Sequence, residues 1–150
     1  MKKFKKVRVG RSGVSGAGLG LFAAERIEKE DLVMIYAGEI IDPNIDALRE
    51  NMRSDLSFYN FSSKDGIVDA RFKGNLSRFI NHGDCGDDNL RSEDMMSEGR
   101  YKIGFYASRL IELGEELFFN YDGQGLLYQN FKEKYPFIRS SRRQSNKMRN

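Results

Sequence analysis

The chain has one cysteine, one histidine and no tryptophan among its 150 residues. A single cysteine, Cys85, excludes an internal disulfide, and no group of cysteines and histidines has the spacing of zinc ligands. No run approaches the ~20 apolar residues of a membrane-spanning helix. The basic start, Met1–Gly10, lacks the apolar stretch of a signal peptide. We therefore expect a soluble intracellular chain in a reducing compartment, with no metal site and no membrane contact.

Charge is distributed unevenly along the chain. Residues 1–11 carry six Lys or Arg and no acid, and residues 132–150 carry seven Lys or Arg and one acid. The residues between them hold 12 basic and 21 acidic side chains, a net charge of −9. An acidic body favours a basic substrate, and basic ends favour nucleic acid or another acidic partner. Residues 139–150 have almost nothing to bury, so we expect a disordered tail there.

Short strand-like runs make up most of the sequence. Apolar or alternating stretches predict strands at residues 6–9, 19–24, 33–36, 39–41, 57–61, 67–70, 101–107 and 116–121. Glycine-rich residues 10–20 and the acidic stretch 83–99 predict loops, and Lys-Asp-Gly at 64–66 predicts a hairpin turn. Together these patterns indicate a mainly β domain with several small sheets.

A helix is predicted over residues 43–53. Asp42 and Pro43 are typical of a helix N-cap and first turn. Apolar side chains then recur at helical spacing, at Ile45, Leu48 and Met52. A second, amphipathic helix is predicted over residues 126–137.

Three features that could suggest other chemistry do not support it. Gly16 and Gly18 begin a GxGxxG pattern, but Leu21 stands at the third glycine position and no crossover helix follows, which argues against dinucleotide binding. His82 has no serine or cysteine nucleophile beside it, and a lone histidine is more often structural than catalytic. The acidic neighbours of Cys85 disfavour a thiolate.

Five segments taken together resemble the SET-domain family over residues 6–125. They occur in the family's order: GLGLFA at 18–23, YAGEII at 36–41, VDA at 68–70, GN at 74–75 with RFINH at 78–82, and GEELFFNY at 114–121. The Phe-Phe pair at 118–119 and the short RFINH segment look most similar to the histone H3-directed branch, including the enhancer-of-zeste and trithorax groups.

The resemblance implies a mainly β SET fold of several small curved sheets with one inserted helix. Residues 78–82 and 116–121 would pack so that one segment passes through a loop formed by the other, a threaded, pseudoknot-like arrangement that is rare among folds. The SET domain would occupy residues 1–125, followed by a C-terminal helical closing element at 126–138 and the tail. Gly83 replaces the family's usual serine, which we expect to loosen the turn.

The resemblance also implies methyl transfer from S-adenosylmethionine to a lysine amine. The cofactor would be held by Gly18, Leu19, Gly20, Arg78, Asn81, His82 and Tyr128. For Arg78, a structural ion pair is the alternative. The histidine would act mainly through its main chain. Since no cysteine-rich segment follows the domain, the closing element would cover the pocket; the alternative is a helix that only stabilises the core.

The catalytic side chains implied by the resemblance are Tyr121, Phe119, Phe58 and Tyr59. The tyrosine hydroxyl of residue 121 would orient the amine. An apolar channel lined by the four side chains would lower the lysine pKa by disfavouring the charged form. Phenylalanine at position 119 predicts capacity for di- or trimethylation.

The expected substrate is a basic peptide, most simply a histone tail with H3 favoured, in nuclear chromatin. The basic ends predict contact with nucleic acid or the nucleosome, and a homodimer is one way to complete a peptide groove. A virus- or bacterium-encoded, host-directed protein is an alternative source. Alternative functions are methylation of a non-histone basic protein, or a catalytically weak SET-fold module that binds chromatin. The presence of Asn81 and Tyr121 argues against the last.

Overall fold

The computed structural model describes residues 3–52, 60–63, 66–84 and 86–120, with backbone alone at 60–63. Within these ranges no helix is both long and apolar enough to cross a membrane. The closing element predicted at 126–138, its helix at 126–137 and the tail predicted at 139–150 lie outside the described residues.

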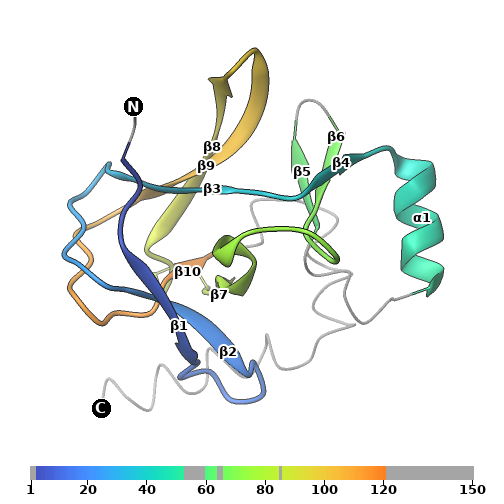
Figure 1. Ribbon diagram of the computed structural model, residues 1–150. Coiled ribbons are helices and arrows are strands. Elements are labelled where there is room, and N and C mark those ends of the chain that lie inside the picture. The colour runs from blue at the N-terminus through green and yellow to red at the C-terminus, as the bar shows by residue number, and fades with distance from the viewer. Residues whose placement is uncertain (1–2, 53–59, 64–65, 85, 121–150) are drawn as a thin grey trace.

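Two of the three sheets that the described residues form are small and antiparallel (Figure 1). β1 (Val7–Arg11) pairs with β2 (Leu19–Ala23), so the glycine-rich segment forms the connection between two strands. In the second sheet β6 (Gly66–Asp69) lies between β4 (Glu39–Ile41) and β5 (Asn60–Ser63). The strands and the hairpin predicted for these segments are therefore confirmed to within a few residues.

The third sheet has five strands and contains the unusual pairing of the fold. Its order is β3-β9-β8-β10-β7, comprising β3 (Leu32–Tyr36), β9 (Arg100–Ala107), β8 (Leu90–Ser97), β10 (Phe118–Phe119) and β7 (Asn81–His82). β10 pairs parallel with both β7 and β8. It therefore lies between two strands that the 83–89 connection joins, which is the threaded arrangement that the resemblance implied.

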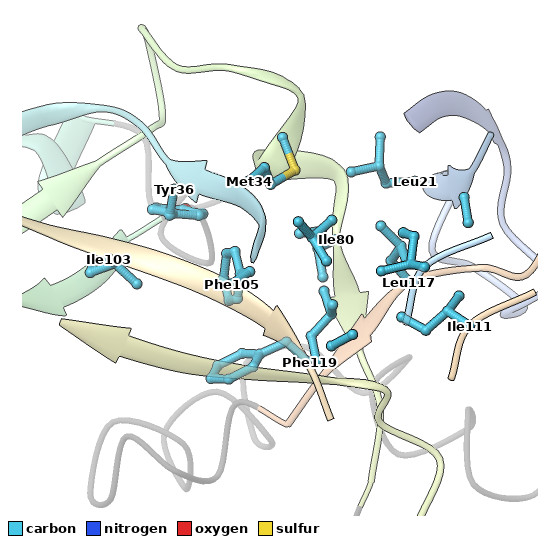
Figure 2. Close-up of a cluster of buried hydrophobic side chains, with 14 of the residues drawn as sticks. Leu21, Met34, Tyr36, Ile80, Ile103, Phe105, Ile111, Leu117 and Phe119 are labelled. Atoms are coloured by element: carbon cyan, nitrogen blue, oxygen red, sulfur yellow. The ribbon is translucent and has the colours of Figure 1, made fainter. Parts of the chain in front are cut away.

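The core fills the space between the β1–β2 sheet and the five-stranded sheet. Figure 2 shows Ile80 between Leu21 on one side and the rings of Tyr36 and Phe105 on the other. Phe105 meets Tyr36 and Phe119 edge to face, with ring centroids 6.0 and 5.2 Å apart. Burial of each large apolar side chain stabilises the fold by roughly 1.5–3 kcal/mol. Strands β7 and β10, which carry predicted site residues, therefore adjoin this core.

A short 3-10 helix, η2 (Leu76–Phe79), precedes β7 and was not predicted from the sequence. Its N-cap is Asn75, whose Oδ1 accepts a hydrogen bond from the Ser77 amide at 3.1 Å. The Asn75 amide also donates to the Ile35 carbonyl oxygen at 2.8 Å. One side chain therefore starts the turn and ties it to β3, which fixes the approach of the chain to β7.

The helix α1 (Pro43–Met52) confirms the prediction for residues 43–53. Asp42 Oδ1 accepts hydrogen bonds from the amides of Asn44 and Ile45 at 2.8 and 3.0 Å, as an N-cap does. The apolar side chains that predicted the helix nevertheless face outward, because Leu48 and Met52 are 64% and 75% exposed and none of the ten residues of α1 is buried. Apolar burial therefore does not hold α1 in place.

Ion pairs hold α1 to the β4–β6 sheet instead. Asp69 is fully buried at the end of β6, and its carboxylate pairs with Arg49 of α1 at 2.6 Å and with Arg71 at 3.3 Å. Arg49 also pairs with Glu39 at 3.3 Å, and Arg71 pairs with Asp46 of α1. The hydrogen bond to Asp69, and then that to Glu39, raises the pKa of Arg49 above its ordinary value, so its guanidinium stays charged at physiological pH.

The loop predicted for residues 83–99 is partly wrong. Residues 90–97 form β8, which pairs with β9 over its whole length. The two strands form a hairpin that projects from the molecule in Figure 1. Paired backbone and a few inward residues, such as the fully buried Leu90, make this polar sequence a strand.

Candidate functional site

The segments predicted to hold a cofactor, residues 18–20 and 78–82, lie next to each other. The side-chain amide of Asn81 donates a hydrogen bond to the Leu19 carbonyl oxygen at 2.9 Å. The same nitrogen lies 3.3 Å from Oε1 of Glu116. Asn81 therefore connects β7 to β2 and to the residue pair just before β10.

Glu116 is a site residue that the sequence reasoning did not single out. Its carboxylate accepts hydrogen bonds from the Ser12 hydroxyl at 2.6 Å and from the Gly13 amide at 3.1 Å, in addition to Asn81. A Cβ added at Gly20 would lie 2.1 Å from Glu116 Oε1. The only signal in the sequence is the second glutamate of the GEEL block, which does not indicate where its side chain points.

Among the described residues, nothing covers the outer side of this junction. Gly18 has φ of +74°, a conformation that favours glycine, and a Cβ added there would meet no atom within 4 Å. Leu19 is 51% exposed although it begins β2. Backbone at Gly18 and Leu19 is therefore accessible to a ligand, with Asn81 beside it.

His82 directs its ring into the protein. The residue is 4% exposed, and its Nε2 lies 3.0 Å from Oδ1 of Asp84. Its backbone pairs with Phe119 in the parallel β7–β10 ladder. A buried imidazole paired with a carboxylate supports the turn after β7, so the His82 ring is directed away from solvent.

Asn89 is a second residue that the sequence reasoning missed. It is 1% exposed. Its side chain forms hydrogen bonds with the backbone of Glu116, just before β10, and of Phe118, the first residue of β10. Its amide donates to the Glu116 carbonyl oxygen at 2.8 Å, and its Oδ1 accepts from the Phe118 amide at 2.8 Å. The backbone amide of Asn89 donates a further hydrogen bond to the Phe118 carbonyl oxygen at 3.1 Å. Asn89 thereby fixes the segment that carries Glu116.

The expectation that Gly83 loosens its turn is wrong. Gly83 is buried, and its amide donates to the Phe119 carbonyl oxygen at 3.0 Å. A Cβ at this position would lie 2.7 Å from Cβ of Phe118 and 3.1 Å from the amide nitrogen of Asp88. The missing side chain lets the connection lie directly against β10, so this turn is tightly packed.

The remaining predicted site residues have different surroundings. Phe119 is 7% exposed and belongs to the core, with its ring against Phe105. The guanidinium carbon of Arg78 lies 5.3 Å from the centroid of the Phe79 ring. Four predicted residues lie outside the described residues: Phe58, Tyr59, Tyr121 and Tyr128. Within the described ranges, no cluster of three His, Cys, Asp or Glu side chains could bind a metal ion.

A strand threaded between β7 and β8, with the asparagine of the RFINH segment bonded to a glycine-rich strand edge, is the arrangement that the resemblance to SET domains implied. The comparison with known families agrees, since the SET domain matches residues 18–122. The chain belongs to the SET-domain family.

Two curated relatives are similar over most of this chain. Histone-lysine N-methyltransferase EZH2 of Chaetomium thermophilum is 40% identical over 126 residues, which cover 78% of this chain and 8% of that protein. The H3 lysine-4 specific histone-lysine N-methyltransferase of Schizosaccharomyces pombe is 44% identical over 107 residues, 69% of this chain and 11% of that protein. The chain therefore spans only about a tenth of the length of these relatives.

A solved structure also has the same fold as this chain. The structure described as ctPRC2 in an autoinhibited conformation bound to S-adenosylmethionine matches with a TM-score of 0.74 and 38% identity. The match covers 88% of this chain and 17% of that chain. The mainly β fold with small curved sheets and a threaded segment is confirmed.

Proposed function

We propose that this protein is an S-adenosylmethionine-dependent protein-lysine N-methyltransferase. The observation that carries the proposal is the hydrogen-bonded junction of Asn81, Leu19 and Glu116, which joins the two predicted cofactor segments beneath an open face. Family membership and similarity to histone-lysine methyltransferases support the reaction class.

The residues at this junction fit the cofactor. Gly18 has no Cβ and open space above it, so a flat or extended ligand can lie directly on the backbone. Leu19 offers a half-exposed apolar side chain, and Asn81 offers a polar one in the same place. When bound, S-adenosylmethionine supplies an activated methyl group. Arg78, the main chain of His82 and Tyr128 complete the proposed binding set.

The protein's main task in such a reaction is to present an uncharged amine. A free lysine has a pKa near 10.4, so deprotonation at neutral pH costs about 4 kcal/mol. An apolar channel lowers that pKa because it disfavours the ammonium form. We assign the channel to Phe58, Tyr59 and Phe119, and we assign alignment of the amine with the methyl group to the Tyr121 hydroxyl.

The proposed substrate is a histone tail, with H3 favoured. The acidic body between residues 12 and 131 suits a basic peptide, and the basic ends suit contact with nucleosomal nucleic acid. Chromatin in the nucleus is the corresponding location, and a homodimer is the proposed assembly. Residues 126–138 would close the cofactor pocket.

A labelled-methyl assay tests the proposal. We expect incorporation from S-adenosylmethionine into a histone mixture, with mass spectra showing di- or trimethyl-lysine because Phe119 leaves room at the amine. Tyr121→Phe should lower turnover by about 100-fold, since misalignment of reacting groups has effects of that size. Tyr106→Phe, which removes a hydroxyl 4.0 Å from the sulfur of Met95, is the matched control and should leave turnover unchanged.

Three outcomes would contradict the proposal or parts of it. Undiminished transfer by Tyr121→Phe would overturn the role of the tyrosine. Monomethyl product alone, after exhaustive turnover, would overturn the product prediction. Nucleosome binding with no transfer to histones or to other lysine-rich proteins would instead support a chromatin-binding module.

A further inference from the structure

We infer that Glu116 is a positioning residue for the cofactor-binding face, acting through the β1–β2 loop and Asn81. This inference rests on the proposed function and deepens it. The Glu116 carboxylate hydrogen-bonds to two segments that border the open face at Gly18: the loop at Ser12 and Gly13, and strand β7 at Asn81. It also lies against a third segment, strand β2, where a Cβ added at Gly20 would be 2.1 Å from Oε1.

Both oxygens of the carboxylate are used. Oε1 accepts from the Ser12 hydroxyl at 2.6 Å and from the Asn81 amide at 3.3 Å, while Oε2 accepts from the Gly13 amide at 3.1 Å. Hydrogen bonds to an ionised acceptor are roughly twice as strong as neutral ones. The Ser12 oxygen accepts in turn from the Val14 amide at 3.0 Å, so the anchor extends along the loop.

The glycine at position 20 is explained by the same carboxylate. A Cβ there would lie 2.1 Å from Oε1 and 3.3 Å from the amide nitrogen of Asn81. Gly20 lies in the regular β1–β2 ladder opposite Gly10, so a special backbone conformation is not the reason for glycine. We conclude that Gly20 makes room for Glu116, whereas Gly18 provides the open backbone.

The backbone of Glu116 is fixed independently of its side chain. It forms a bridge with Phe22, and its carbonyl oxygen accepts from Asn89 at 2.8 Å. Changing the carboxylate should therefore release the loop and Asn81 while the strand remains in place.

The neighbouring Glu115 supplies a matched control. Its carboxylate pairs with Arg109 at 3.0 Å and accepts from the Glu112 amide at 3.0 Å. It contacts none of the loop, β2 or β7 residues that Glu116 joins. Glu115→Gln and Glu116→Gln thus remove the same charge from adjacent positions with different contacts.

The first experiment measures the dissociation constant of S-adenosylmethionine by calorimetry, at a temperature well below unfolding. In Glu116→Gln the new side-chain amide has a single acceptor oxygen. Its NH2 group must face at least one of the donors on Ser12, Gly13 and Asn81, so at least one hydrogen bond is lost. We expect its dissociation constant to rise about 10-fold, in line with loss of a hydrogen bond to a charged group, and that of Glu115→Gln to stay within about twofold. The KM for the peptide should change in neither variant.

A double-mutant cycle tests the conclusion that Gly20 makes room for the Glu116 carboxylate. Gly20→Ala alone should weaken binding about as much as Glu116→Gln, because its methyl group displaces the carboxylate. In a Glu116→Ala background the displaced group is gone, so adding Gly20→Ala should have little further effect and the two changes should be strongly non-additive. Additive losses would show that Gly20 acts through direct ligand approach and would overturn this part.

Amide hydrogen exchange of the unliganded 150-residue chain separates this inference from the proposed function. Glu116→Gln should speed exchange at Gly13 and in residues 12–18, and Glu115→Gln should not. Unchanged exchange in Glu116→Gln would overturn the positioning role whatever the cofactor result. If the wild type shows the protected loop but does not bind S-adenosylmethionine, the proposed function fails, and the role of Glu116 in cofactor binding fails with it.

Discussion

Single residues show how a motif can predict a position without its contacts. The RFINH segment predicted that Asn81 and His82 lie at the site, and the structure brings Asn81 onto Leu19. The burial of His82 against Asp84, and the use of Glu116 as a common acceptor, depend on contacts between segments distant in sequence. Local patterns carry no information on such contacts, so these roles required the structure.

Gly83 gives a prediction about packing. Gly83→Ala should lower the free energy of unfolding by about 2 kcal/mol, because its Cβ would press on Phe118 and on the backbone of Asp88. Urea denaturation measures the change. Gly13→Ala is the matched control, since its added Cβ would meet its nearest atom at an ordinary 3.7 Å. Equal stability of Gly83→Ala and wild type would show that the connection can move away from β10.

The elements divide into those with local signals and those without. The N-cap and proline at Asp42 and Pro43 predicted α1 correctly. The β8–β9 hairpin was missed because its two-residue turn is Glu98 and Gly99, with φ of 53° and 75°. Turns of this kind favour Asn-Gly or Asp-Gly, so glutamate gave no signal.

The attachment of α1 leads to a prediction about ion pairs. Asp69→Asn should lower the free energy of unfolding by about 3 kcal/mol, because it removes the buried charge that Arg49 and Arg71 both face. Amide exchange in α1 should also become faster. The control is Glu93→Gln, which breaks a largely exposed pair with Arg91 and should cost at most about 1 kcal/mol. A smaller loss in Asp69→Asn than in the control would refute the role of these ion pairs in holding α1 to the β4–β6 sheet.

At the scale of the whole molecule, the mainly β class and the threaded arrangement were both predicted. Periodicity gave the many short strands, and the resemblance gave the threading. The order of strands in a sheet depends on pairing between residues such as Phe119 and Leu90, which no local pattern specifies. The placement of β10 between β7 and β8 therefore came from family resemblance alone.

Asn89 provides the corresponding prediction for the fold as a whole. Asn89→Ala removes the two side-chain hydrogen bonds that hold β10 and leaves the Phe118 amide and the Glu116 carbonyl without that partner. The free energy of unfolding should fall by about 3 kcal/mol, measured by urea denaturation. Asn44→Ala, at an exposed position of α1, should change it by no more than about 0.5 kcal/mol. A small effect of Asn89→Ala would mean that backbone pairing suffices to keep β10 in place.

The position of β10 also has a consequence during synthesis. The strand that completes the five-stranded sheet is among the last of the described residues to be made, yet it belongs between strands made earlier. Until residue 119 has left the ribosome, His82 and the buried Leu90 lack the strand that pairs with them. The nascent chain therefore exposes apolar surface until β10 is available, and surface of that kind favours aggregation during folding.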